Sequence, residues 1–163
     1  MSFVGSYVWK MRQMLGRQRL LVSGVGLIVT AEDGKVWLGL RSDSRDWSYF
    51  GGAMELGDSV MDTVRNEMRE ETGIDTNEAD WTFVGIHSDP LETNYTYPNG
   101  DAVQIVNHLF TMRLKGEPGL GDEEHTEFAL FDLNALPTPM KADTDKAIAL
   151  YKAFLETGKV QVK

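Results

Sequence analysis

A chain of 163 residues, 42% hydrophobic and 25% charged, has the length and composition of a single soluble globular domain. The absence of cysteine excludes a disulfide framework and a zinc–thiolate site, and it fits a reducing compartment. The net charge of −9 argues against a broad electrostatic grip on nucleic acid, but it is compatible with a small phosphate ligand that arrives with a divalent metal ion.

The first thirty residues contain no apolar run of transmembrane length and no signal-peptide layout. We therefore expect a cytoplasmic protein that does not enter a membrane. Residues 4–15 have the spacing of a short helix, which belongs to an N-terminal extension over residues 1–19. The expected face of this helix consists of Tyr7, Met11, Met14 and Leu15. A domain over residues 20–163 follows the extension.

Two strands and a third, shorter one open this domain. The segments "LVSGVGLIVT" and "KVWLGLRS" predict a hairpin, because the Asp-Gly pair in the intervening "AEDGK" is a strong turn signal. The segment "WSYFGG" predicts a short strand that its paired glycines stop.

The next element is a helix over residues 59–72, with Asp58 or Ser59 as its N-cap and Gly73 as its end. Its apolar stripe consists of Val60, Met61, Val64 and Met68. Glu67 and Glu71 fall within or beside this stripe. Buried carboxylates are costly unless something pairs with them, so we expect a cation nearby.

Strands again dominate the rest of the chain. The segments "WTFVGIHS", "VQIVNHLFTMRL" and "EFALFD" predict three of them, "YPNGD" has the composition of a turn, and residues 141–156 predict a closing helix. Strands that alternate with helices in this way predict an α/β fold, a mixed sheet with helices on its faces in an α/β/α sandwich.

Three carboxylates on the helix carry the chemistry. Glu67, Glu70 and Glu71 stand at positions i, i+3 and i+4, and hard oxygen ligands at this density suit Mg²⁺ or Mn²⁺. The backbone carbonyl of Gly52 could reach the same ion, because no Cβ blocks the approach. The alternative is a solvated acidic face without a ligand.

The stretch from Gly52 to Ile74 resembles the Nudix box, G-x5-E-x7-R-E-U-x-E-E-x-G-U, where U is a bulky aliphatic residue. Seven of the nine specified positions agree, and the spacing is kept without insertion. The likeness extends over roughly residues 20 to 155. The segment "TYPNGDAV" also resembles a bacterial subgroup described as ADP-ribose pyrophosphatase-like.

The resemblance implies a Nudix-type α/β/α sandwich and a pyrophosphohydrolase that cleaves the diphosphate of a nucleoside diphosphate derivative, such as a nucleotide sugar, ADP-ribose or a nucleoside triphosphate. It further implies that the metal ligands are Gly52, Glu67, Glu70 and Glu71. The catalytic acids that it implies are Glu67, Glu71 and Glu127, the last standing for an acid from the loop around residues 123–127. The substrate-binding residues are expected to be Trp47, Tyr49, Glu55 and Tyr97.

Two positions depart from the pattern. Asp58 stands where the family has glutamate, and it keeps the acid. Asn66 stands where the family has an arginine that pairs with the metal-binding acids, so the surroundings of the metal site are altered. A weakened domain that binds a nucleotide as a sensor or partner module is therefore the alternative function.

Each of the three histidines lacks a histidine partner at i+4, which argues against a histidine metal site. A homodimer is compatible with the sequence.

Overall fold

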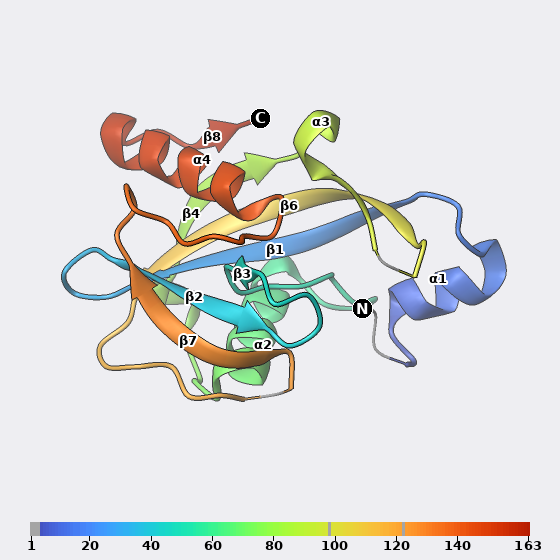
Figure 1. Cartoon of the computed structure of the whole chain (residues 1–163), viewed down its shortest axis with the longest axis horizontal. Coiled ribbons are helices and arrows are strands. Elements are labelled where there is room, and N and C mark those ends of the chain that lie inside the picture. The colour runs from blue at the N-terminus through green and yellow to red at the C-terminus, as the bar shows by residue number, and fades with distance from the viewer. Residues whose placement is uncertain (1–3, 98, 122) are drawn as a thin grey trace.

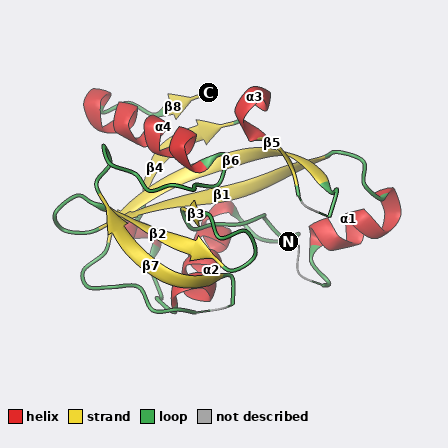
Figure 2. Ribbon diagram, in the orientation of Figure 1, coloured by secondary structure: helices red, strands yellow, loops and turns green. Residues whose placement is uncertain are grey.

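The computed structural model describes residues 4–97, 99–121 and 123–163. A mixed sheet forms the middle layer, with α2 (Val60–Thr72) on one face and α4 (Thr144–Thr157) on the other (Figures 1 and 2). The predicted α/β/α sandwich is thus confirmed.

Among the described residues the sheet has eight strands, of which six follow the order β3-β2-β1-β6-β4-β8, while β5 pairs with β6 and β7 pairs with β2. Their bounds are Leu20–Thr30 for β1, Val36–Arg41 for β2, Trp47–Ser48 for β3, Thr82–His87 for β4, Asn94–Thr96 for β5, Ala102–Arg113 for β6, His125–Phe131 for β7 and Gln161–Val162 for β8. The longest pairing is parallel and joins β1 to β6 over eleven residue pairs. The other pairings of β6 and all those of β2 are antiparallel, which makes the sheet mixed.

The predicted hairpin of β1 and β2 forms at its Asp-Gly turn, where the Ala31 amide donates to the Lys35 carbonyl at 2.8 Å. The two strands then diverge, and the chain after β3 bonds to β1 instead. The amides of Leu27 and Val25 donate to the carbonyls of Phe50 and Gly52 at 2.8 and 2.9 Å. The predicted strand "WSYFGG" is therefore a strand at Trp47–Ser48 only, and its glycines lie along β1.

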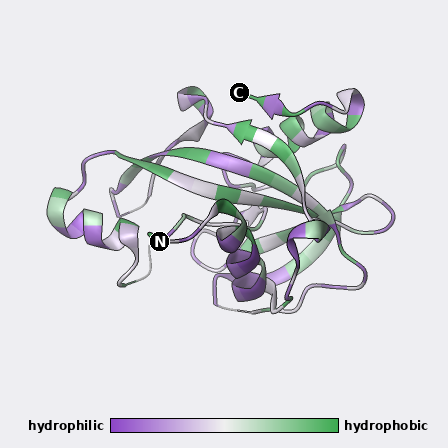
Figure 3. Ribbon diagram, turned by 180° about the vertical axis from the view of Figure 1, so that it is seen from behind, coloured by the Kyte–Doolittle hydropathy of each residue, from purple (hydrophilic) through white to green (hydrophobic). Residues whose placement is uncertain are grey.

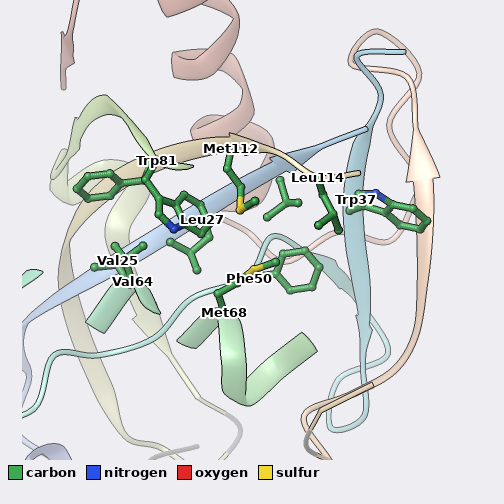
Figure 4. Close-up of a cluster of buried hydrophobic side chains, with 11 residues drawn as sticks. Val25, Leu27, Trp37, Phe50, Val64, Met68, Trp81, Met112 and Leu114 are labelled. Atoms are coloured by element: carbon green, nitrogen blue, oxygen red, sulfur yellow. The ribbon is translucent and has the colours of Figure 1, made fainter. Parts of the chain in front are cut away.

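Helix α2 has the ends that the sequence predicts. The Ser59 side chain accepts from the Asp62 amide, the Asp62 side chain accepts in return from the Ser59 amide, and Gly73 ends the helix in the left-handed conformation. Its apolar stripe packs with β1 and Phe50 into the first core cluster (Figure 4). Polar residues cover the remainder of α2, while hydrophobic residues predominate along the strands (Figure 3).

Apolar side chains of β1 point alternately to the two faces of the sheet, so this strand contributes to the hydrophobic core on both faces. Val25, Leu27 and Val29 belong to the cluster with α2, whereas Ile28 belongs to the cluster with Ala147 and its neighbours on α4. Because successive residues of a strand point to opposite faces, a strand covered on both faces has a continuous apolar run, as "GVGLIV" does.

The expected face of the N-terminal helix is wrong in part. Helix α1 (Tyr7–Leu15) buries Val8 and Arg12 and half-buries Tyr7 and Met11, while Met14 and Leu15 are exposed. Burial of Arg12 follows from its guanidinium, which donates to the carbonyls of Gly16, Gln18 and Ala102.

Several short elements are absent from the sequence-based prediction. They are the 3-10 turn Glu78–Asp80, helix α3 (Pro90–Thr93) and strands β5 and β8. Within the described part of the chain, no helix has the length and apolar character needed to cross a membrane.

Candidate functional site

A cavity of about 600 Å³ lies between α2, the ends of β1 and β6, helix α1 and the segment that leads into α4. It brings together most residues that the sequence singles out, namely Tyr49, Gly52, Glu55, Glu67, Glu70, Glu71 and Tyr97. Trp47 and Glu127 lie outside its lining. The ring of Trp47 packs against Phe131 at a centroid distance of 4.8 Å, and Glu127 is exposed on β7.

Glu67 lies directly against Gly52. A Cβ built on Gly52 would come within 2.5 Å of Glu67 Oε1, so the carboxylate occupies the space that any side chain at position 52 would take. The Gly52 carbonyl accepts the amide of Val25 and keeps a second lone pair. The glycine thus places a backbone carbonyl and a carboxylate side by side.

Glu71 is 2% exposed, which excludes a solvated acidic face for this residue. Its Oε1 accepts the amide of Gly51 at 2.9 Å, and its Oε2 lies 3.6 Å from Nδ1 of His125. The paired glycines therefore contact both inward glutamates, Gly51 through its amide and Gly52 through its α-carbon.

His125 is buried beneath Glu71, with Nε2 at 3.3 Å from the Ser48 hydroxyl. Burial lowers the pKa of His125 to about 4, so the ring is neutral near pH 7. A Cβ on Gly39 of β2 would lie 2.3 Å from the ring. This glycine inside the strand "VWLGLR" is the sequence signal that could have pointed to a close neighbour.

The donor set fits a hard divalent cation, because the cavity offers carboxylate and carbonyl oxygens and the chain has no thiol. Glu70 is exposed at the rim, so its side chain is not fixed by packing. Among the described residues, no three aspartate, glutamate or histidine side chains already converge in a group that could hold a metal ion.

The rest of the cavity wall is rich in charge. Arg41 donates to Asp43 at 2.9 Å and to Glu124 at 2.6 Å, and the guanidinium lowers the pKa of Asp43 to about 2. Arg12 lies 3.8 Å from Asp101. Acids that line the cavity are Asp43, Glu55, Glu67, Glu70, Glu71, Asp101, Glu124 and Asp143. They exceed the basic side chains Arg12, Arg41 and Lys141, which favours binding of a cation.

A buried hydrogen-bond chain that the sequence did not reveal forms another wall. Lys141 Nζ lies 3.2 Å from Asp143, which accepts the Tyr49 hydroxyl at 2.8 Å. The Asn107 amide donates to the Tyr49 oxygen at 2.7 Å. Burial favours the neutral form of Asp143, yet Lys141 and Tyr49 together hold its pKa below the ordinary value.

Helix α1 and the β5–β6 hairpin close one end of the cavity. Both oxygens of Glu55 accept the Tyr7 amide, at 3.0 and 2.8 Å, so this expected substrate contact is engaged with the start of α1. The rings of Tyr95 and Tyr97 meet edge to face at 4.7 Å. In the expected "YPNGD" turn, the Gly100 amide donates to the Tyr97 carbonyl, and Pro98 lies outside the described residues.

Asn66 has partners other than the metal-binding acids. Its amide nitrogen lies 3.4 Å from Asp58 Oδ2, and its amide oxygen accepts from Arg69 at 2.9 Å. The Asn66 amide therefore bridges Asp58 and Arg69. The positive charge of the Arg69 guanidinium is connected to the Asp58 carboxylate through this amide.

The comparisons with known proteins agree on a family. A family model described as NUDIX domain matches residues 20–151. The m7GpppN-mRNA hydrolase NUDT17 of Xenopus laevis is 34% identical over 68 residues, covering 39% of this chain and 23% of the relative. The RNA pyrophosphohydrolase of Bartonella bacilliformis is 33% identical over 60 residues, covering 31% and 35%. The aligned regions thus span no more than about a third of either relative.

Two solved structures show the same fold at low identity. The MutT NUDIX hydrolase of Burkholderia pseudomallei is 23% identical with a TM-score of 0.65, covering 80% of this chain and 97% of that one. The ADP-ribose pyrophosphatase of Streptococcus suis is 24% identical with a TM-score of 0.64, covering 86% and 96%.

Proposed function

The chain belongs to the NUDIX-domain family, and on this premise we propose that it is a pyrophosphohydrolase, dependent on Mg²⁺ or Mn²⁺, that cleaves the diphosphate of a nucleoside diphosphate derivative. The single observation that carries the proposal is the contact of Glu67 with Gly52 beside the Glu71–Gly51 hydrogen bond. Both lie in a cavity of about 600 Å³, a volume that suits a nucleotide-sized ligand.

The proposed metal ligands are Glu67, Glu70, Glu71 and the Gly52 carbonyl. When bound, the ion would neutralise phosphate charge and activate water, the chemistry that divalent metals supply in phosphate hydrolysis. Hydrolysis forms a bond from the water oxygen to one phosphorus and breaks the bond between that phosphorus and the bridging oxygen. The attacking water loses a proton. We propose that Glu67 or Glu71 accepts this proton, since both line the cavity and Glu127 does not.

The remaining walls are proposed to hold the substrate. Tyr95 and Tyr97 offer aromatic faces on which a base could stack, and the Tyr97 side chain reaches the cavity from the hairpin. Tyr49 also lines the cavity, as part of its hydrogen-bond chain. Trp47 is less suited to a direct contact, because its ring packs on Phe131.

A panel of substrates with Mg²⁺ and Mn²⁺ tests the activity. Release of phosphate products is measured for ADP-ribose, nucleotide sugars, nucleoside triphosphates and a short RNA with a 5′-triphosphate. Turnover of at least one substrate, dependent on added metal, is expected. If none is hydrolysed but calorimetry detects nucleotide binding, the sensor alternative replaces the enzyme, with Asn66 as the feature that favours it.

Addition of Mg²⁺ or Mn²⁺ is expected to raise the melting temperature. An ion that binds only the folded state at one hundred times its dissociation constant adds about 2.7 kcal/mol. For a domain of this size that gain corresponds to roughly 5–10 °C. Differential scanning fluorimetry with NaCl at matched ionic strength as the control measures it. An unchanged melting curve at millimolar metal, with and without nucleotide, contradicts the metal site.

Replacement of Asn66 by arginine is expected to tighten Mg²⁺ binding and raise turnover, by up to about 10-fold. The guanidinium would meet Asp58, the present partner of Asn66, in a charge-assisted hydrogen bond. Titration of the metal and kcat on the substrate found by the panel are compared with Asn94→Arg, a surface control. A folded Asn66→Arg protein that is weaker in both respects shows instead that Asn66 is fitted to its bonds with Asp58 and Arg69.

A further inference from the structure

A β-bulge near the start of β7 turns the His125 side chain toward α2. Leu40 of β2 pairs with Glu127, but the next residue of β2 pairs with His125, so Thr126 is an extra residue in β7. In a regular strand His125 and Phe128, three positions apart, would point to opposite faces. Their rings instead meet at a centroid distance of 5.5 Å, and Phe128 packs against the core cluster of α2. The bulge therefore places the imidazole on the face of the sheet that α2 covers.

The residues around the imidazole leave it a close-fitting space. Gly39 of β2 lies so near that a Cβ there would come within 2.3 Å of the ring. The ring of Phe50 stands edge to face with it at a centroid distance of 5.9 Å, and the Ser48 hydroxyl lies 3.3 Å from Nε2. His125 is 4% exposed, so its two ring nitrogens can bond only to the groups packed around them.

The second ring nitrogen, Nδ1, faces Glu71. It is buried and makes no hydrogen bond within the described part of the chain. Glu71 Oε2 lies 3.6 Å away, which exceeds the length of an ordinary N–H···O bond, about 3.2 Å at most, by an amount that a small side-chain rotation removes. A carboxylate only accepts, whereas the Ser48 hydroxyl can donate as well as accept. In a neutral ring both contacts are favourable at once only if Nδ1 carries the hydrogen and Ser48 donates to Nε2.

We propose that His125 is a positioning residue for Glu71, which donates from Nδ1 to Oε2 and thereby fixes the orientation of the carboxylate toward the cation. The Gly51 amide already holds Oε1 at 2.9 Å, so the carboxylate is held at both of its oxygens. A carboxylate has about four lone-pair sites, and two such bonds are compatible with metal coordination. This inference rests on the proposed function, because the cation is the ion assigned to Glu71.

The first test measures Mn²⁺ binding by electron paramagnetic resonance in the absence of substrate, so it does not depend on turnover. His125→Leu and His125→Asn leave similar space, but only asparagine keeps an N–H donor at the position of Nδ1. His125→Leu is expected to weaken binding about 10–100-fold, and His125→Asn to bind at least about 5-fold more tightly than His125→Leu. His87→Leu is the control and should bind normally, because it removes another buried histidine that contacts a carboxylate, Glu92, outside the cavity lining.

The second test needs only the wild-type protein for its result, so it decides the matter even if the His125 variants do not fold. Long-range proton–nitrogen NMR correlations of the metal-free protein near neutral pH distinguish the two tautomers of each ring. His87→Leu and His108→Leu identify the signals of the other two histidines. We expect the hydrogen of His125 on Nδ1. A hydrogen on Nε2 alone overturns the inference, because Nδ1 would then present a lone pair to the Glu71 carboxylate.

The two proposals fail in distinguishable ways. Absence of Mn²⁺ binding by the wild-type chain refutes the proposed metal site and the role of His125 with it. If the wild type binds, Glu71→Gln loses binding and folded His125→Leu binds like the wild type, then the metal site stands and the role of His125 is refuted. Equal weakening in folded His125→Asn and His125→Leu also refutes it, since the loss then comes from the space that the ring filled. Melting temperatures recorded without metal show which variants are folded.

Discussion

Replacement of Glu67 by glutamine is expected to reduce turnover about 10²–10³-fold, the loss that follows removal of one electrostatic group aimed at developing charge. Glutamine keeps the shape that fills the space at the Gly52 α-carbon, so the fold should persist. The negative charge is what disappears, and with it a ligand for the cation and a candidate acceptor for the proton of water. Glu71→Gln should likewise lose most turnover, because Glu71 is buried in the same cavity.

The matched control is Glu127→Gln, which makes the same chemical change on the exposed face of β7 outside the cavity. Its kcat should stay within about 2-fold of the wild type, since surface substitutions are usually near neutral. Circular dichroism and the melting temperature are measured to check that the three variants are folded. Near-wild-type rates for both Glu67→Gln and Glu71→Gln remove the basis for the site, whereas a large loss in Glu127→Gln moves the catalytic acid to β7.

Replacement of Gly51 by alanine is expected to destabilise the protein by about 2–4 kcal/mol, from left-handed backbone strain of about 1–2 kcal/mol and a steric clash of similar or larger size. Gly51 has a φ of 131°, and a Cβ there would lie 2.2 Å from the Val25 carbonyl oxygen. The backbone cannot move away without displacing the amide that donates to Glu71. Activity should therefore fall together with stability.

Gly57→Ala separates the two causes. Gly57 also has a positive φ, of 99°, but a Cβ there meets nothing within 4 Å, so only the backbone strain applies. Urea unfolding followed by fluorescence gives the free energy of unfolding of each variant, and Gly51→Ala should be the less stable by at least about 1 kcal/mol. Equal losses in the two variants show that the close approach to Val25 adds nothing.

The parts of the fold that short-range patterns determine could be predicted from the sequence. Helix α2 follows from its capping residues, its terminal glycine and its apolar stripe, all of which act within a few residues. The long strands β1 and β6 follow from their apolar runs. The face of α1 could not be predicted, because burial of Arg12 depends on the carbonyl of Ala102, ninety positions away in the sequence.

The same distinction between short-range patterns and long-range contacts applies to the candidate site. Glu67 and Glu71 could be identified because their spacing on one helix fixes their direction. The neutral His125 beneath Glu71 and the chain from Lys141 to Asn107 could not, because their members come from separate segments that only the folded sheet brings together. Trp47 and Glu127 illustrate the reverse, since proximity to a motif in sequence did not place either side chain in the cavity.

The parallel pairing of β1 with β6 also determines when during folding a site can exist. Gly24 and His108, which contact each other across this ladder, are 84 positions apart, and α2 with its glutamates belongs to the intervening loop. Closing a loop of this length is costly and slow compared with forming a hairpin or a helix. Pulse-labelling hydrogen exchange should show the amides of β6 becoming protected after those of α2, and simultaneous protection would contradict this order. A nascent chain that has emerged only as far as residue 101 carries every glutamate of the Nudix box, but it lacks the strand that completes the cavity around them.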